Sequence, residues 1–224
     1  MRVVSLVPSV SETLEAWGRR PVAVTRFCDV AGVARVGGTK DPDLEAIVAL
    51  APDLVVLDEE ENRREDYDAL LARGLAVHAT AVRSLADVDR ELAALAEVVG
   101  HPWAATRRAA PRAPRHRVVV PIWRRPWIAL GAPTYGSSLL AHLGFENALA
   151  HRGAYPHVGL DEMAATRPDL VLAPSEPYPF AERHRAELET VAPVRYVDGR
   201  DLFWWGERTA AAMARLASVL EVSD

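Results

Sequence analysis

The feature that most constrains the fold of this chain is one pattern that recurs 116 residues further along. A predicted helix, a Pro-Asp turn and a buried strand run from residue 44 to 57, and the same order returns from 160 to 173. The strand predicted at Val3 recurs near Val118 at almost the same spacing. Two matches at one spacing predict two similar lobes. A chance recurrence of a common α/β unit is the alternative.

Short hydrophobic runs alternate with amphipathic segments along the whole chain. The predicted strands cover 3–7, 22–25, 54–57, 75–78, 118–120, 170–172 and 194–197. The predicted helices cover 9–17, 41–50, 62–73, 84–99, 137–143, 160–166, 180–191 and 207–222. Ser9 and Glu12 have the spacing of a capping box at the start of the first helix. This alternation predicts an α/β fold with two similar lobes, each with a parallel sheet flanked by helices.

The middle of the chain has a different composition. Three prolines and several arginines between His101 and His116 predict a helical stub followed by a linker. We therefore expect an N-terminal lobe at 1–83, a connecting helix and linker at 84–116, and a C-terminal lobe at 117–224. Ligands of open parallel sheets bind beyond the carboxyl ends of the strands, which predicts a ligand cleft between the lobes.

Composition and motifs exclude several functional classes. The net charge of −5 disfavours nucleic acid as a partner. No apolar run reaches the roughly 18 residues of a membrane helix, so no direct membrane insertion is expected. There is no G-x-S-x-G elbow, P-loop or G-x-G-x-x-G, so the chain is not expected to be an enzyme. The seven histidines show no ligand-like spacing, so neither a bare metal site nor a tightly bound cofactor is expected.

The N-terminus bears on localisation. Met1 and Arg2 lead directly into the first predicted strand, which leaves no room for a signal peptide. If Met1 is the native start, we expect a cytoplasmic protein. If a leader has been trimmed, a periplasmic or cell-surface location is expected.

Aromatic side chains are concentrated in the loops expected at the cleft. Six tryptophans is a high number for this length, and large flat rings with a polar edge suit a broad, partly apolar ligand. His157 is the best single candidate for a metal ligand, because it precedes a predicted helix in a cleft loop. The predicted ligand-binding residues are Pro8, Ser9, Phe27, Asp58, Trp123, Trp127, Tyr135, His157, Trp204 and Trp205.

Several motifs together resemble one family. They are Val4 to Leu14, Val22 to Asp29 followed by Val36-Gly37-Gly38, Ala51 to Val55, and Leu202 to Thr209. In order and spacing they resemble the class III, helical-backbone periplasmic binding proteins, and most of all their cobalamin-binding branch. Family members normally carry a long unbroken helix between the lobes, whereas Gly100-His101-Pro102 interrupts it here.

The resemblance implies capture of cobalamin or a related corrinoid in an interlobe cleft, with Phe27 and Trp205 near the ligand. It also implies docking on an ABC permease through Glu65 and Glu182. Binding of a ferric siderophore or haem on the same scaffold is an alternative, for which Arg26, Arg124, Arg125 and Arg208 are the candidate cations. A cytosolic enzyme or sensor that reuses the fold is a third.

Overall fold

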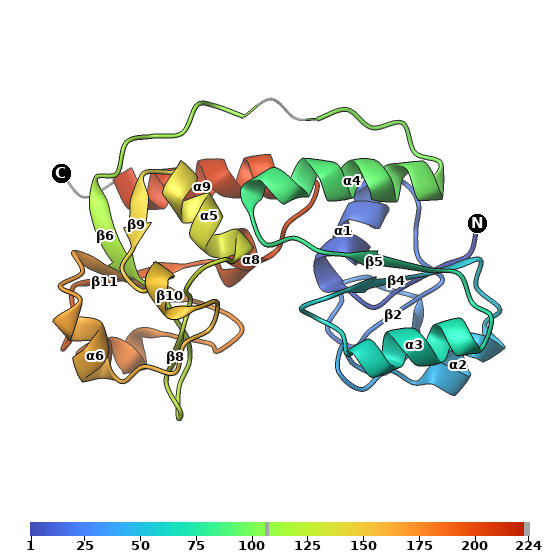
Figure 1. The fold of residues 1–224 in the computed structure, drawn as a ribbon, viewed down its shortest axis with the longest axis horizontal. Helices are drawn as coiled ribbons and strands as arrows, with labels where there is room; N and C mark the ends of the chain where they lie inside the picture. The colour runs from blue at the N-terminus through green and yellow to red at the C-terminus, as the bar shows by residue number, and fades with distance from the viewer. Residues whose placement is uncertain (106–107, 222–224) are drawn as a thin grey trace. The chain divides into compact units, whose positions relative to one another are not determined.

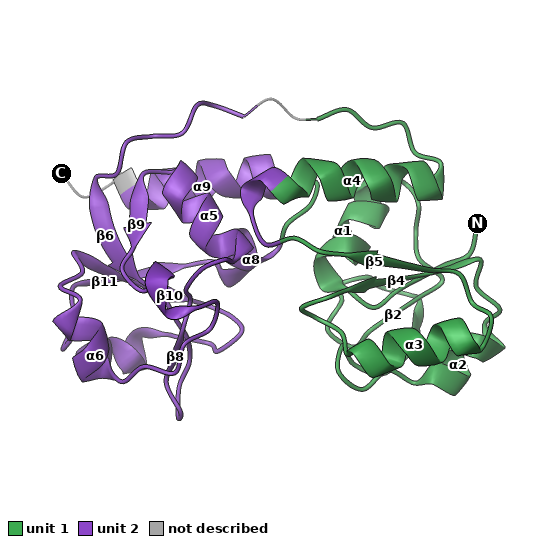
Figure 2. Cartoon of the chain, viewed as in Figure 1, with its two compact units in different colours: residues 1–82, 87–105, 205–207 green, residues 83–86, 106–204, 208–224 purple. Residues whose placement is uncertain are grey.

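The computed structural model describes residues 1–105 and 108–221 (Figure 1). The chain divides into two compact units (Figure 2). Unit 1 comprises residues 1–82, 87–105 and 205–207, and unit 2 comprises 83–86, 106–204 and 208–224. The helix that the sequence suggested as a separate connector therefore lies mostly within unit 1.

Unit 1 is built on a five-stranded parallel sheet in the order β3-β2-β1-β4-β5. Its strands are β1 (Val3–Ser5), β2 (Ala23–Val24), β3 (Ala34–Arg35), β4 (Leu54–Asp58) and β5 (Val77–Thr80). β4 is buried along its whole length, as its run of apolar residues predicts for a central strand. The two-residue strand β3 was not predicted.

Helices cover both faces of this sheet (Figure 1). They are α1 (Pro8–Ala16), α2 (Leu44–Ala49), α3 (Arg64–Ala72) and α4 (Leu85–Val99). Ile47 of α2 and Leu70 of α3 pack with Val55 and Leu57 of β4 in one hydrophobic core. α1 and α4 lie on the opposite face in Figure 1.

Unit 2 repeats the same strand order with one strand fewer. Its four-stranded parallel sheet has the order β11-β10-β6-β9. The strands are β6 (His116–Val119), β9 (Phe145–Asn147), β10 (Leu170–Pro174) and β11 (Val194–Val197). A separate antiparallel hairpin consists of β7 (Pro121–Trp123) and β8 (Ile128–Ala129). β7, β8 and β9 were not predicted.

The helices of unit 2 range from four to 13 residues in length. They are α5 (Tyr135–His142), α6 (Leu160–Ala165), α7 (Arg185–Leu188), α8 (Gly199–Phe203) and α9 (Thr209–Glu221), with short 3-10 turns η1 (Ala150–Arg152) and η2 (Glu182–His184). Met163 of α6 packs into a core with Val119, Ala129 and Leu149. α5 and α9 lie on the other face of the sheet (Figure 1).

The internal repeat is confirmed in detail. α2 and β4 begin at Leu44 and Leu54, and α6 and β10 begin 116 residues later. Just beyond the C-cap of each helix lies a residue with left-handed backbone geometry, Ala51 at φ 42° and Arg167 at φ 52°. A proline follows each of them, which is a common way to end a helix because proline cannot continue it. The Pro-Asp pair thus marks where each helix gives way to a buried strand.

Several local predictions were wrong. Ser9 does not cap the first helix, because α1 starts one residue earlier with Pro8 in its first turn and Val7 as an N-cap without a side-chain bond. The helix expected over 180–191 is replaced by η2 and α7. No helical stub follows α4 between residues 101 and 105. Within the described ranges, none of the helices has both the length and the apolar character needed to cross a membrane.

Candidate functional site

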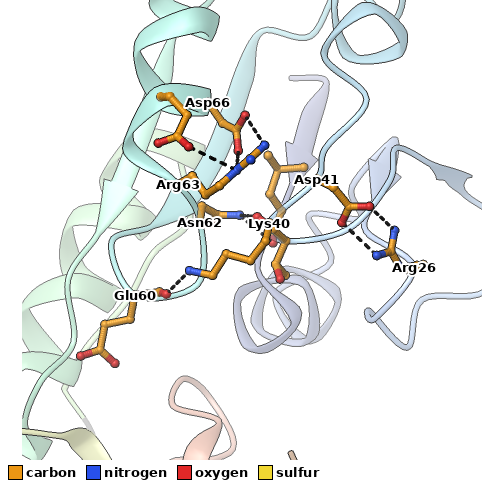
Figure 3. A network of polar contacts seen from close by, with 10 residues as sticks. Arg26, Lys40, Asp41, Glu60, Asn62, Arg63 and Asp66 are labelled. Carbon is orange, nitrogen blue, oxygen red and sulfur yellow. Dashed lines mark hydrogen bonds and ion pairs between the residues drawn. The ribbon is translucent and has the colours of Figure 1, made fainter. Parts of the chain in front are cut away.

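In unit 1, the segment that follows β2 at the carboxyl edge of the sheet presents an aromatic ring to solvent. Phe27 is 53% exposed, although it is a large apolar side chain. The Arg26 guanidinium lies 4.8 Å from the centre of that ring. Two hydrogen bonds of 2.9 and 3.0 Å fix Arg26 to Asp41 (Figure 3). Gly38 lies under this pair, and a Cβ there would meet the Arg26 guanidinium carbon at 2.7 Å.

The loop after β4 is held by its own polar side chains. Asp58 accepts hydrogen bonds from the Glu60 backbone N–H and the Thr80 hydroxyl, at 2.9 and 2.8 Å. Asn62 accepts one from the backbone N–H of Asp58 and donates one to the carbonyl of Thr39 (Figure 3). Burial raises the pKa of Asp58, and the bond from Thr80 opposes that rise. Asp58 therefore organises the loop, and its carboxylate is directed into the protein.

The first turn of α1 follows β1 at the same edge. Pro8 and Ser9 both lie there, but both are buried. The structure thus places three of the predicted residues of unit 1, Pro8, Ser9 and Phe27, beyond strand ends of one sheet. Among these three, only Phe27 is exposed.

In unit 2, a three-stranded ribbon follows β6. It consists of β7, β8 and residues 154–158, which run antiparallel beside β8. Ala129 donates to the Pro156 carbonyl at 3.0 Å, and Val158 donates to the Trp127 carbonyl at 3.2 Å. The pairing sets Trp123 opposite Ile128 and Ile128 opposite His157.

The two faces of this ribbon differ. Side chains alternate along a strand, and Trp127, Ala129 and Val158 pack on the core of unit 2. The opposite face carries Ile128 and, across from it, His157. The pairing of β7 with β8 is irregular between Pro121 and Trp123, so alternation does not assign Trp123 to a face. Trp123 is 43% exposed and His157 is also exposed, whereas Trp127 packs on the core of unit 2.

An aromatic cluster supports the ribbon. Trp127 stacks on Phe180 at 6.0 Å between ring centres, and Phe180 adjoins Tyr178 at 4.7 Å. Tyr178 meets the exposed Trp123 edge-on at 5.7 Å. His184 closes the cluster and accepts a hydrogen bond at Nδ1 from the Ala181 N–H, at 3.1 Å. Burial, Arg183 and Arg124 lower the pKa of His184, so its ring is neutral at pH 7.

A second aromatic group follows β11. Trp204 lies between two guanidinium groups, Arg200 at 4.8 Å and Arg208 at 5.7 Å from its ring. Burial raises the pKa of Glu176, and Arg200 and the hydrogen bond from Trp204 oppose that rise. Arg208 also donates to the buried Asp201 at 2.8 Å. The ring of Trp204 is half-buried, and cations flank it.

Two more of the predicted residues are buried. Tyr135 is 4% exposed, and its hydroxyl lies 3.3 Å from the Thr209 hydroxyl in unit 2. Burial raises the pKa of Tyr135 to about 12. Trp205 is 5% exposed and belongs to unit 1, whereas its neighbour Trp204 belongs to unit 2. A ligand role for Tyr135 and Trp205 remains a prediction.

Some residues that the structure brings to these places were not among the predicted ligand-binding residues. Tyr155 lies two positions before His157 and therefore on the same ribbon face, and it is 45% exposed. Tyr178 and Glu176 follow β10 and adjoin Trp123 and Trp204. Their position after a predicted strand was the available signal, but cross-strand register has no signature in the sequence.

Comparison with known proteins adds to this geometry. The family model described as "Periplasmic binding protein" matches residues 3–186. A vitamin B12-binding protein of Salmonella choleraesuis is 26% identical over 76% of this chain and 71% of its own length. The crystal structure of a periplasmic vitamin B12-binding protein of Vibrio cholerae is 18% identical, with a TM-score of 0.77 over 99% of this chain and 96% of that chain.

The crystal structure of a periplasmic haem-binding protein from Pseudomonas aeruginosa also has a similar fold. It is 19% identical, with a TM-score of 0.80 over 99% of this chain and 93% of that one. The predicted two-lobe α/β fold is thereby confirmed. Since the family model covers most of the sequence, the chain belongs to the periplasmic binding protein family.

Proposed function

We propose that this chain captures cobalamin or a related corrinoid, with aromatic side chains at the carboxyl edges of its sheets against the flat ring system. The observation that carries the proposal is the exposed Trp123, held edge-on to Tyr178 above a packed aromatic cluster. A ring held in this way loses little side-chain freedom when a ligand stacks on it. The relatives named vitamin B12-binding proteins support the corrinoid.

Phe27 in unit 1 and Trp204 in unit 2 are further candidate stacking faces, each within its own unit. Each has a guanidinium against its ring, which leaves an aromatic face with positive charge beside it. Corrinoids carry amide groups around the ring and one phosphodiester, which suits hydrogen-bond donors next to a stacking surface. Arg200 provides such donors beside Trp204.

Haem or a ferric siderophore is the second candidate ligand. Arg200 beside Trp204 favours it, because carboxylate substituents of a porphyrin pair well with guanidinium groups. Arg124 and Arg208 contribute less, since they are already bound to Glu187 and Asp201, each at 2.8 Å. The third candidate is a cytosolic enzyme or sensor on the same fold, which a lack of response to every one of these ligands would favour.

Tryptophan fluorescence titration tests these proposals. Cyanocobalamin, ferric protoporphyrin IX and ferrichrome are added separately to the protein. Saturable quenching by cyanocobalamin supports the corrinoid, and Trp123→Ala should weaken binding about three- to tenfold, as expected for one aromatic contact. Trp103→Ala is the matched control, because Trp103 follows α4 away from the strand ends. Quenching by the porphyrin or the siderophore alone would favour the second candidate.

We also propose that a permease docks through Glu65 and Glu182. Both side chains are strongly exposed, at 70% and 72%, and each has a neighbouring arginine, Arg63 and Arg185. Exposed ion pairs are weak and exchange partners readily. Charge reversal of both glutamates should abolish stimulation of the permease ATPase and leave ligand quenching unchanged.

A further inference from the structure

The segment after β2 makes a tight turn at the point where it presents Phe27. The Cys28 N–H donates to the Thr25 carbonyl at 3.2 Å, which closes a four-residue turn with Arg26 and Phe27 at its two central positions. Phe27 is 53% exposed at this position. Connecting segments ordinarily move more than the strands and helices that they join. The rigidity of this turn therefore decides how well Phe27 is prepared for a ligand.

Both ends of the turn are anchored inside unit 1 by their side chains. Thr25 is fully buried, and Cys28 is 4% exposed. The Thr25 hydroxyl lies 3.2 Å from the Cys28 sulfur, and the Ser11 hydroxyl donates to the same sulfur at 3.2 Å. Backbone carbonyls at such a place need hydrogen-bond donors as well. The question is which group of the protein provides them.

Arg35 is that group, and it lies on β3, the edge strand of the sheet. Its Nη1 donates to the carbonyls of Thr25 and Cys28 at 2.9 and 2.7 Å, and its Nη2 donates to the Val30 carbonyl at 2.8 Å. One guanidinium therefore joins both ends of the turn to the segment that follows it. The planar fork of arginine holds its donors in fixed directions, which the single ammonium of lysine does not.

We propose that Arg35 is a positioning residue, which holds the turn from Thr25 to Cys28 in the conformation that presents Phe27 for stacking. A ring on a mobile turn must be ordered when a ligand binds, and this ordering weakens binding. Arg35 removes that cost in advance, so it acts through Phe27 and not on the ligand. The inference rests on the proposed function, in which Phe27 is a stacking face, but the rigidity of the turn can also be measured without a ligand.

The cysteine in the turn provides that measurement. Cys28 is the only cysteine of the chain, and a thiol reagent such as dithiobis-nitrobenzoate reaches its buried sulfur only when the turn opens. Arg35→Met should raise the labelling rate at least about tenfold, because hydrogen bonds from a charged donor are lost. This increase should exceed the increase in the unfolded fraction, which urea denaturation measures for the same variant. A labelling rate equal to that of the wild type would overturn the proposal.

Arg73→Met is the matched control for labelling. Arg73 follows α3 in the same unit and also donates to a backbone carbonyl, that of Ala69 at 3.1 Å. Because this bond lies outside the turn, the substitution should leave the labelling rate of Cys28 unchanged. Faster labelling in Arg73→Met than in Arg35→Met would show that Cys28 reports general loosening of unit 1, and would overturn the proposal.

A double-mutant cycle tests whether the held turn serves binding. Tryptophan fluorescence titration with cyanocobalamin compares wild type, Arg35→Met, Phe27→Ala and the double variant. Arg35→Met should weaken binding about three- to tenfold when Phe27 is present and have no further effect when it is alanine. Equal effects of Arg35→Met in both backgrounds would overturn the role through Phe27 and leave the proposed function standing. Absence of quenching in the wild type would overturn the proposed corrinoid function and this inference together.

Discussion

Asp169 accepts a hydrogen bond at Oδ2 from the backbone N–H of Arg117, at 2.6 Å, and its own N–H donates to the Arg117 carbonyl at 2.7 Å. Asp53 makes the same two bonds with Arg2 in unit 1, at 2.5 and 2.9 Å. In each unit these two hydrogen bonds join the start of one central strand to the start of the strand beside it. The repeated aspartate is therefore explained by the way the sheets are assembled.

Asp169→Ala should lower the free energy of unfolding by about 1 kcal/mol, because a hydrogen bond to an ionised acceptor is lost at the surface. Urea denaturation followed by circular dichroism measures the change. Asp161→Ala, an exposed acid in the first turn of α6, provides a control with a smaller expected loss. Equal effects of the two substitutions would contradict the role given to Asp169.

Arg167→Gly should stabilise the protein by about 0.5 kcal/mol. Arg167 has φ 52°, a conformation that glycine adopts without steric cost. The steric cost removed from the folded state exceeds the free energy that the unfolded chain gains from the greater conformational freedom of glycine. Thermal unfolding measures the shift. Ala165→Gly, inside α6, should instead destabilise by about 0.5–1 kcal/mol, and loss of stability in both variants would refute the prediction.

Asp58→Asn should change the pH dependence of stability. Burial raises the pKa of Asp58 above its unfolded value of about 3.9, so the folded protein holds this proton more tightly. The wild type then loses stability relative to Asp58→Asn as pH rises from about 4 through the folded pKa. The asparagine keeps an oxygen for the Glu60 N–H. Parallel urea curves between pH 4 and 8 test this, and a constant difference would show that Asp58 titrates normally.

His184 should have the opposite pH dependence. Burial, Arg183 and Arg124 lower its pKa, and Glu187 opposes them in part. As pH falls, the unfolded chain takes up this proton at a higher pH than the folded protein does. The wild type should therefore lose stability as pH falls through about 6.5. His184→Asn keeps an acceptor for the Ala181 N–H without titrating. Its stability between pH 5 and 7 should therefore vary less than that of the wild type, and equal variation would exclude His184 as the cause.

Elements whose ends are marked by characteristic residues were predictable from the sequence. α6 and β10 were placed closely, because Arg167-Pro168-Asp169 marks the helix end and an apolar run follows. Strands of two or three residues, such as β3 and β8, carry too little pattern to be recognised. The hairpin was missed because Arg124, Arg125 and Pro126 look like a simple loop. The first helix was misjudged because a proline in its first turn competed with the capping-box pattern.

The candidate site was predictable as a set of loops but not as a surface. Trp123 and Trp127 looked equivalent in the sequence, since both follow the same strand. In the structure, Trp127 packs on the core of unit 2, whereas Trp123 is 43% exposed. Asp58 likewise looked like a ligand contact until its hydrogen bonds to Thr80 and Glu60 were located. In both cases, contacts between residues far apart in the sequence decide whether the side chain is available to a ligand.

Unit 1 takes its last three residues from near the end of the chain. Glu207 accepts a hydrogen bond from the Trp17 indole at 2.9 Å, and its N–H donates to the Thr13 hydroxyl. During synthesis these bonds to unit 1 can therefore form only after residues 205–207 have left the ribosome. A single cut between the two halves of the sequence would leave neither half complete, so the repeated units are not interchangeable modules.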